Sequence, residues 1–112
     1  MKNISIGQKE IIHFIGVGGI GMSGLAQVMK IMGFKIQGSD QNKNKNTYNC
    51  SKAGIKVFIG HAKKNIKRAT IVVRSSAIKD NNVEITTRIH NMNDYMVFWE
   101  RNQNLSEHAV GA

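Results

Sequence analysis

The chain has 112 residues, of which 41% are hydrophobic, and this length suits one compact domain with a core of its own. It carries a formal charge of +9 and a single cysteine, Cys50, so an internal disulfide is excluded, and the paired Cys/His spacing of a zinc site does not occur. No apolar run reaches the roughly 20 residues of a membrane-spanning helix, and the N-terminus lacks the apolar core of a signal peptide. We therefore expect a cytoplasmic protein that binds neither a membrane nor a metal.

The first half of the chain predicts a strand, a helix and a second strand. The apolar run 11–15 ends in glycines and is typical of a buried parallel strand. The segment after the glycines, which ends at Gly33, has apolar residues at the spacing of one helical face, namely Leu25, Val28, Met29 and Met32. A second strand is predicted over 35–38, with Ser39 and Asp40 at its C-terminal end, before a polar loop over 41–46.

The second half continues the alternation. The sequence predicts, in order, a short helix over 47–53, strands over 56–59 and 70–73, a helix over 83–91 and a strand over 95–98. Short connections of this kind require right-handed crossovers. The prediction for residues 1–98 is therefore an α/β domain, a Rossmann-like open parallel sheet of about five strands with helices on both faces. Residues 99–112 have helical propensity but a thin apolar face, and they are interpreted as a terminal helix or a tail.

The strongest motif is a glycine-rich loop between the first strand and the first helix. The run Gly16-Val17-Gly18-Gly19-Ile20-Gly21-Met22-Ser23-Gly24 contains G-x-G-x-x-G in the context of a dinucleotide-binding turn. Gly16 is expected to permit the tight turn, Gly18 the close approach of phosphates and Gly21 the packing of helix on strand. The free N–H groups of the helix N-terminus would then bind a diphosphate. The alternative is a tight turn with no ligand.

Polar residues follow the other predicted strands, where ligands bind in open parallel sheets. Asp40 lies nineteen residues after Gly21, at the place where a carboxylate accepts hydrogen bonds from ribose hydroxyls. A turn or capping aspartate is an equal alternative. The further candidates for the pocket wall are His61, Ser75, Ser76 and Ala77. The plain alternative for His61 is a loop residue, and for Ser75 and Ser76 it is capping of the next helix. His13, inside the first strand, is interpreted as a packed histidine.

These residues together resemble the UDP-N-acetylmuramate–L-alanine ligases of the Mur ligase family. The segments that carry the resemblance are 13–24, 33–40, 54–61, 65–66 and 72–78, in the family's order and approximate spacing. In that family the N-terminal domain holds the UDP part of UDP-N-acetylmuramate, a central domain binds ATP and magnesium, and the amide bond forms through an acyl phosphate on the route to peptidoglycan. The resemblance implies that Gly18, Gly19, Ile20, Gly21 and Met22 line the diphosphate. It also implies that Ser39 and Asp40 lie near the uridine and that His61, Ser75, Ser76 and Ala77 complete the pocket. From the glycine loop itself, Gly16 and Ser23 are expected as further ligand contacts, with the Ser23 hydroxyl as a donor.

The sequence also departs from the family. It contains no G-x-x-x-x-G-K-[ST] phosphate loop, and Val83 stands where the family usually has proline. The resemblance weakens after about Thr86. We therefore expect the ATP-binding central domain and the C-terminal domain to be absent, so that the chain binds substrate without a catalytic residue or cofactor of its own, unless separate chains supply the missing domains.

Two other classes of function stay open. One is an NAD(P)-binding Rossmann module of a dehydrogenase or regulatory protein, which would use the same glycine loop with Asp40 on the ribose. The other is a basic nucleic-acid-binding domain, suggested by the charge of +9. The basic residues are scattered and are not interleaved with aromatic residues, so we expect no nucleic-acid partner.

Overall fold

The computed structural model describes residues 9–75, 77–89, 95–99 and 105–107. Within these residues the elements follow in the order β1 (Ile11–Ile15), α1 (Ile20–Ile31), β2 (Lys35–Asp40), α2 (Lys45–Lys52), β3 (Lys56–Ile59), the 3-10 helix η1 (Lys63–Ile66), β4 (Ile71–Ser75), α3 (Val83–Ile89), β5 (Tyr95–Trp99) and β6 (Leu105–Glu107). The predicted bounds of β1 and β3 agree with the structure. β2 and β4 each extend two residues further than predicted, and η1 was not predicted.

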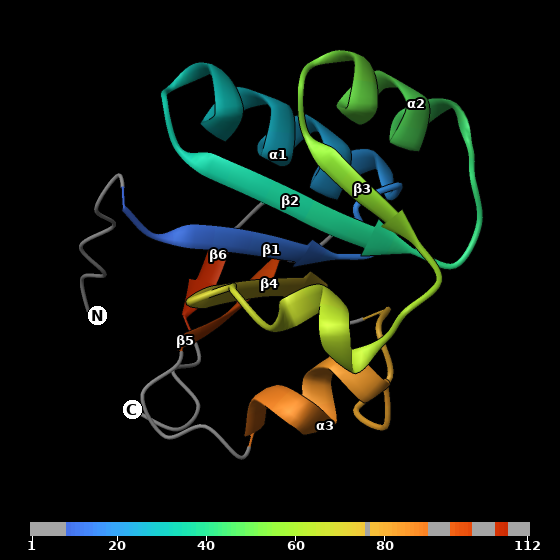
Figure 1. Ribbon diagram of the computed structural model, residues 1–112, viewed down its shortest axis with the longest axis vertical. Coiled ribbons are helices and arrows are strands. Elements are labelled where there is room, and N and C mark those ends of the chain that lie inside the picture. Colours follow the sequence, from blue (N-terminus) through green and yellow to red (C-terminus); the bar gives the residue numbers. More distant parts are fainter. Residues whose placement is uncertain (1–8, 76, 90–94, 100–104, 108–112) are drawn as a thin grey trace.

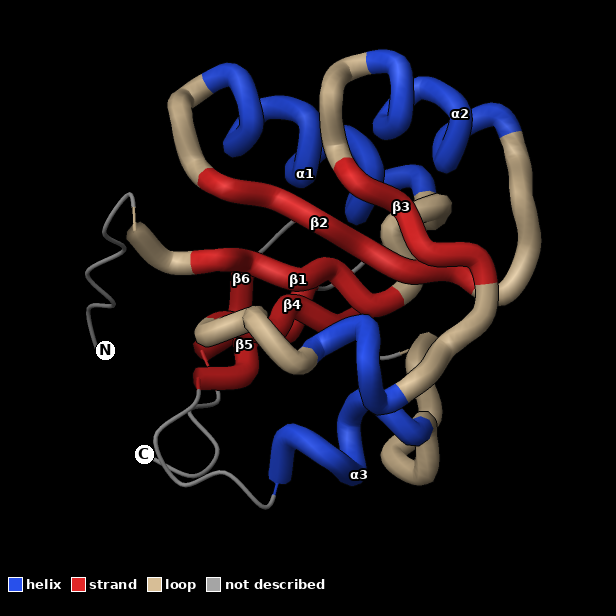
Figure 2. The backbone as a smooth tube through the Cα atoms, viewed as in Figure 1, coloured by secondary structure: helices blue, strands red, loops and turns tan. Residues whose placement is uncertain are grey.

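The strands form one open sheet in the order β3-β2-β1-β4-β5-β6. Neighbouring strands from β3 to β5 are parallel, and β6 is antiparallel to β5. Helices α1 and α2 cover one face of the sheet, and η1 and α3 lie on the other (Figures 1 and 2). The predicted α/β fold with an open parallel sheet and helices on both faces is confirmed.

The C-terminal part differs from the helix considered for residues 99–112. Trp99 belongs to β5, and residues 105–107 form β6, whose Leu105 is paired with Trp99. Backbone pairing along the edge of β5 overrides the weak helical propensity of this segment. The other residues of 99–112, and the predicted end of α3 at residues 90–91, lie outside the described residues.

Alternation along the buried strands divides the core between the two faces. Ile12 and Phe14 of β1 belong to the larger apolar cluster, together with Met22 and Ala26 of α1. The alternate residues of β1, His13 and Ile15, point to the opposite face, because successive side chains of a strand alternate between the two faces of the sheet. Ile15 therefore packs with the smaller cluster on the face of α3. His13 shares the face of Ile15.

Helix α1 buries a face other than the one predicted for it. Leu25 and Met29 pack against the core as expected, but Val28 and Met32 are 54% and 61% exposed. The side chains of α1 that are buried are Met22, Ser23 and Ala26. The helix carries overlapping apolar stripes, and spacing alone does not choose between them. Small side chains at 23 and 26 favour this choice, because they let α1 pack close to the sheet. Among the described residues, no helix has the length and apolar character needed to cross a membrane.

Candidate functional site

The loop between β1 and α1 is a tight turn held by β2. The N–H groups of Gly16 and Val17 both donate to the carbonyl of Ser39, at 2.8 and 2.9 Å. Gly16 has φ +81°, and an added Cβ there would lie 2.9 Å from Ile78 Cδ1. The positive φ favours glycine, as the sequence predicts for this turn, and a Cβ would also displace the end of the Ile78 side chain.

Gly18 is held between β2 and the start of α2 by hydrogen bonds. Its N–H donates to Asp40 Oδ2 at 2.8 Å, and its carbonyl accepts hydrogen bonds from the side-chain amides of Asn44 and Asn46, at 3.3 and 2.9 Å. A Cβ on Gly18 would lie within 3.0 Å of Asp40, Asn44 and Thr47. Protein side chains therefore occupy the space that a Cβ at position 18 would enter. Glycine is therefore needed here because the loop packs against β2 and α2.

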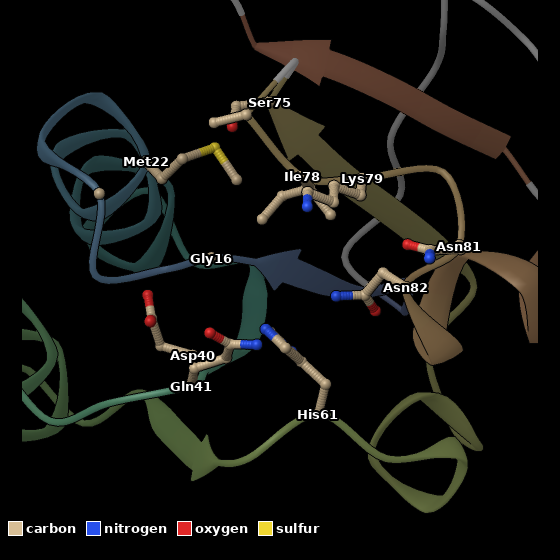
Figure 3. A pocket seen from close by; sticks show the side chains of 12 residues that line it. Gly16, Met22, Asp40, Gln41, His61, Ser75, Ile78, Lys79, Asn81 and Asn82 are labelled. Carbon is tan, nitrogen blue, oxygen red and sulfur yellow. The ribbon is translucent and has the colours of Figure 1, made fainter.

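A pocket of about 510 Å³ opens at the carboxyl ends of the parallel strands. Its lining residues are Gly16, Gly19, Met22, Asp40, Gln41, His61, Ser75, Ala77, Ile78, Lys79, Asn81 and Asn82. Figure 3 shows Asp40, Gln41 and His61 on one side of the pocket and Ile78 and Lys79 on the other. Five of the lining residues were not predicted as site residues, namely Gln41, Ile78, Lys79, Asn81 and Asn82. They carry no distinctive motif, and four of them follow the end of β4.

Seven of the predicted site residues line this pocket, namely Gly16, Gly19, Met22, Asp40, His61, Ser75 and Ala77. Five others are not among its lining residues, namely Gly18, Ile20, Gly21, Ser23 and Ser39. Ile20 is 89% exposed, whereas Ser23 and Ser39 are buried. Ser76 lies outside the described residues.

The N-terminus of α1 adds partial positive charge to the pocket. Gly19, the N-cap residue, makes no side-chain cap, and the first turn contains no acidic residue. The N–H groups of the first turn have no carbonyl one turn earlier within the helix. Since Gly19 and Met22 line the pocket, this end of the helix can favour a bound anion.

A buried polar cluster supports the pocket from the α3 face, and we call it the Glu84 cluster (His13, Gln37, Ser39, His61, Asn65 and Glu84). Glu84 is fully buried. Its Oε1 accepts hydrogen bonds from His13 Nε2 at 2.7 Å and Ser39 Oγ at 2.6 Å. Its Oε2 accepts from the N–H of Ala62 at 3.1 Å and from Asn65 Nδ2 at 2.8 Å. The carboxylate thus joins the ends of β1 and β2, the loop after β3, and η1.

These donors keep Glu84 ionised. Burial raises the pKa of Glu84, but the hydrogen bonds from His13, Ser39 and Asn65 more than offset this and lower the pKa from 4.5 to about 2. The expectation that His13 is a packed histidine is confirmed, since it is fully buried and bonded on both ring nitrogens. Glu84 was missed, because nothing in the sequence shows that the first turn of α3 faces His13.

Arg74 shapes the opposite wall of the pocket. Its side chain is nearly buried, donates to the carbonyl of Ile78, and pairs through Nη1 with Asp80 Oδ1 at 2.8 Å. These contacts hold the turn after β4, which carries Ile78 and Lys79 into the pocket lining. Among the described residues, no group of three or more His, Cys, Asp or Glu side chains is suited to hold a metal ion.

Comparison with known proteins agrees with the resemblance. A model of the Mur ligase family, catalytic domain, matches residues 11–109. The UDP-N-acetylmuramate–L-alanine ligase of Pelagibacter ubique is 61% identical over 82 residues, which are 73% of this chain and 18% of that protein. The ligase of the same name from Rickettsia typhi is 57% identical over 74 residues, 66% of this chain and 15% of that protein. The chain therefore spans less than a fifth of the length of these relatives.

Two solved structures are similar to the chain in fold. The UDP-N-acetylmuramate–alanine ligase of Thermotoga maritima has a TM-score of 0.64 and 36% identity, over 67% of this chain and 17% of that one. The UDP-N-acetylmuramate:L-alanyl-γ-D-glutamyl-meso-diaminopimelate ligase of Neisseria meningitides has a TM-score of 0.68 and 26% identity, over 80% of this chain and 28% of that one. Because the family model matches most of its length, the chain belongs to the Mur ligase family, and it is similar to the N-terminal region of the UDP-N-acetylmuramate–L-alanine ligases.

Proposed function

We propose that the chain binds UDP-N-acetylmuramate in the pocket at the carboxyl ends of β1 to β4. The observation that carries this proposal is the 61% identity with a UDP-N-acetylmuramate–L-alanine ligase, over a stretch of 82 residues long enough to include most of the domain. The pocket volume of about 510 Å³ lies within the usual range for small-molecule sites.

The charges of the pocket suit a ligand with a diphosphate. The N-terminus of α1 provides the oriented N–H groups of its first turn, where Met22 lines the pocket, and Lys79 adds a cation on the opposite wall. Asp40 is partly engaged, because its Oδ2 accepts from Gly18 and its Oδ1 lies 3.5 Å from the N–H of Asn42. We propose that the diphosphate lies near α1 and Lys79, and that the polar side chains of His61, Gln41 and Asn82 contact the nucleoside or the sugar.

We further propose that this chain alone does not form the amide bond. Its 112 residues contain no G-x-x-x-x-G-K-[ST] loop, the motif that holds the phosphates of ATP together with magnesium. Ligation on the route to peptidoglycan would then need residues beyond this domain, on the same polypeptide or on a separate chain.

A thermal-shift titration of the purified chain tests the binding proposal. The ligands are UDP-N-acetylmuramate, UDP-N-acetylglucosamine, NAD and NADP, and a ligand at 100 times its Kd adds about 2.7 kcal/mol of stability. We expect UDP-N-acetylmuramate to stabilise the chain at a lower concentration than the other three ligands. Stabilisation by NAD or NADP alone would instead favour a nicotinamide-binding module, and a folded sample that responds to none of the four would contradict the proposal.

A matched pair of variants locates the ligand. Lys79→Ala removes the cation of the pocket wall, whereas Lys64→Ala removes an exposed cation on η1, outside the pocket lining. One charge-assisted hydrogen bond contributes roughly 1.5–3 kcal/mol. We therefore expect Lys79→Ala to weaken UDP-N-acetylmuramate binding by about tenfold or more, and Lys64→Ala to leave it unchanged. Equal effects of the two variants would show that the ligand does not bind in this pocket.

A further inference from the structure

The imidazole of His61 is held from behind by the Glu84 cluster. His61 Nδ1 lies 3.0 Å from Ser39 Oγ and 3.5 Å from Glu84 Oε2. The side chain is only 9% exposed, yet it lines the pocket, and Figure 3 shows it pointing into the cavity. One ring nitrogen is therefore engaged with the protein, and the other is left for a ligand.

The directions of the hydrogen bonds determine which nitrogen carries hydrogen. Ser39 has one hydroxyl hydrogen and donates it to Glu84 Oε1 at 2.6 Å. Ser39 Oγ can then only accept from His61, so His61 carries its hydrogen on Nδ1. In the neutral ring, Nε2 is left with a lone pair that can accept a hydrogen bond in the pocket.

The other hydrogen bonds of the Glu84 cluster determine the tautomer of His13 by the same reasoning. Gln37 Nε2 donates to the carbonyl of Asn65 at 2.6 Å and to His13 Nδ1 at 2.8 Å. The carbonyl of Asn65 cannot donate, so it sets the orientation of the Gln37 amide. His13 must then carry hydrogen on Nε2, the nitrogen that donates to Glu84. With four donors on its two oxygens, the carboxylate has its hydrogen-bonding capacity filled, and being fully buried it acts only through its neighbours.

We propose that Glu84 is a positioning residue for the pocket: through Ser39, it fixes the orientation and the tautomer of His61, so that Nε2 is offered as an acceptor to a hydroxyl or N–H group of the ligand. This inference rests on the proposed function for the identity of the ligand. It assigns a positioning role to Ser39, which does not line the pocket, and to Glu84, which no sequence motif indicated.

A purely structural role for Glu84 predicts something different. If the cluster only holds α3 against the sheet, changes in it alter stability but leave the state of His61 and the selectivity of the pocket untouched. The tautomer of His61 and the coupling between Glu84 and His61 therefore distinguish the two roles.

The first test is made without ligand. Imidazole nitrogen NMR of the ¹⁵N-labelled chain should show hydrogen on Nδ1 of His61 and on Nε2 of His13. Ser39→Ala removes the acceptor for His61 Nδ1, and Glu84→Gln places an amide N–H against a hydrogen-bond donor in either orientation. We expect both variants to lose the single Nδ1–H tautomer of His61, while Thr86→Ala, an exposed change on α3, keeps it. A wild-type His61 with hydrogen on Nε2, or an unchanged tautomer in Ser39→Ala, would overturn the proposal.

The second test is a double-mutant cycle on the affinity for UDP-N-acetylmuramate. Glu84→Gln should weaken binding about tenfold in the wild-type background and less than twofold in the His61→Ala background, because its effect passes through His61. The same weakening in both backgrounds would contradict the proposal. If Glu84→Gln does not fold, Ser39→Ala takes its place in the cycle. A wild-type chain that shows the predicted tautomer but does not bind the nucleotide would refute the proposed function and leave the positioning role intact.

Discussion

Replacing Gly18 by alanine should lower the free energy of unfolding, even in the absence of ligand. The added Cβ would lie 2.8 Å from Asn44 Nδ2, 2.8 Å from Asp40 Oδ2 and 2.9 Å from Thr47 Cγ2. Contacts this short require the loop to shift or the Asp40 and Asn44 side chains to leave their hydrogen bonds with it, and overpacking of this kind costs roughly 1–3 kcal/mol. With an m value of about 2 kcal/mol/M in urea, a cost of about 2 kcal/mol lowers the unfolding midpoint by about 1 M.

Gly24→Ala is the matched control, made one turn into α1. Nothing lies within 4 Å of a Cβ added at Gly24, and the residue is exposed in a helix. Alanine in an open helical position stabilises by about 0.5–1 kcal/mol relative to glycine. The same substitution, six residues apart, is therefore expected to change stability in opposite directions.

Urea unfolding followed by circular dichroism measures both effects on the ligand-free chain. If glycine at 18 served only to admit a phosphate, Gly18→Ala would match the wild type in urea and would differ only in nucleotide affinity. That result would refute the packing role of Gly18. Equal destabilisation by both substitutions would also refute it, since it would show a general intolerance of the segment to alanine.

Three further predictions concern the supports of the pocket. The folded-state pKa of Glu84 is lowered from 4.5 to about 2, so ionised Glu84 should contribute about 3 kcal/mol to the free energy of unfolding above pH 4.5. This contribution should be lost as the pH falls toward 2. Unfolding curves measured at several pH values should show the loss in the wild type and not in Glu84→Gln. Asn44→Ala removes the side chain that caps α2 through the N–H of Thr47 at 2.8 Å and should cost about 1 kcal/mol in thermal unfolding. Asp80→Asn should change stability by less than about 1 kcal/mol, because this carboxylate is 90% exposed. Arg74→Ala should cost about 2–3 kcal/mol, because it removes a nearly buried guanidinium and its hydrogen bond to the Ile78 carbonyl. Equal effects of the two substitutions in urea unfolding would contradict the assigned roles.

The elements of the fold were largely predictable because their signals are local. The apolar run of β1 and the glycines after it define a strand and a turn without reference to the rest of the chain. Where two local solutions compete, the prediction failed. Val28 and Met32 satisfy helical spacing as well as Met22 and Ala26 do, and only the shape of the sheet surface decides which pair is buried.

The sequence by itself determined the alternating α/β architecture, the glycine turn at Gly16 and the family, since each depends on residues adjacent in the chain. Only the tertiary structure decided which side chains from distant parts of the sequence come into contact. Glu84 lies 71 residues from His13 and 45 from Ser39, yet its carboxylate contacts both. At position 18, the side chains of Asp40 and Asn44, from β2 and the start of α2, leave no room for a Cβ. Such contacts depend on strand register and helix rotation, which are set by packing over the whole domain, so local spacing cannot reveal them.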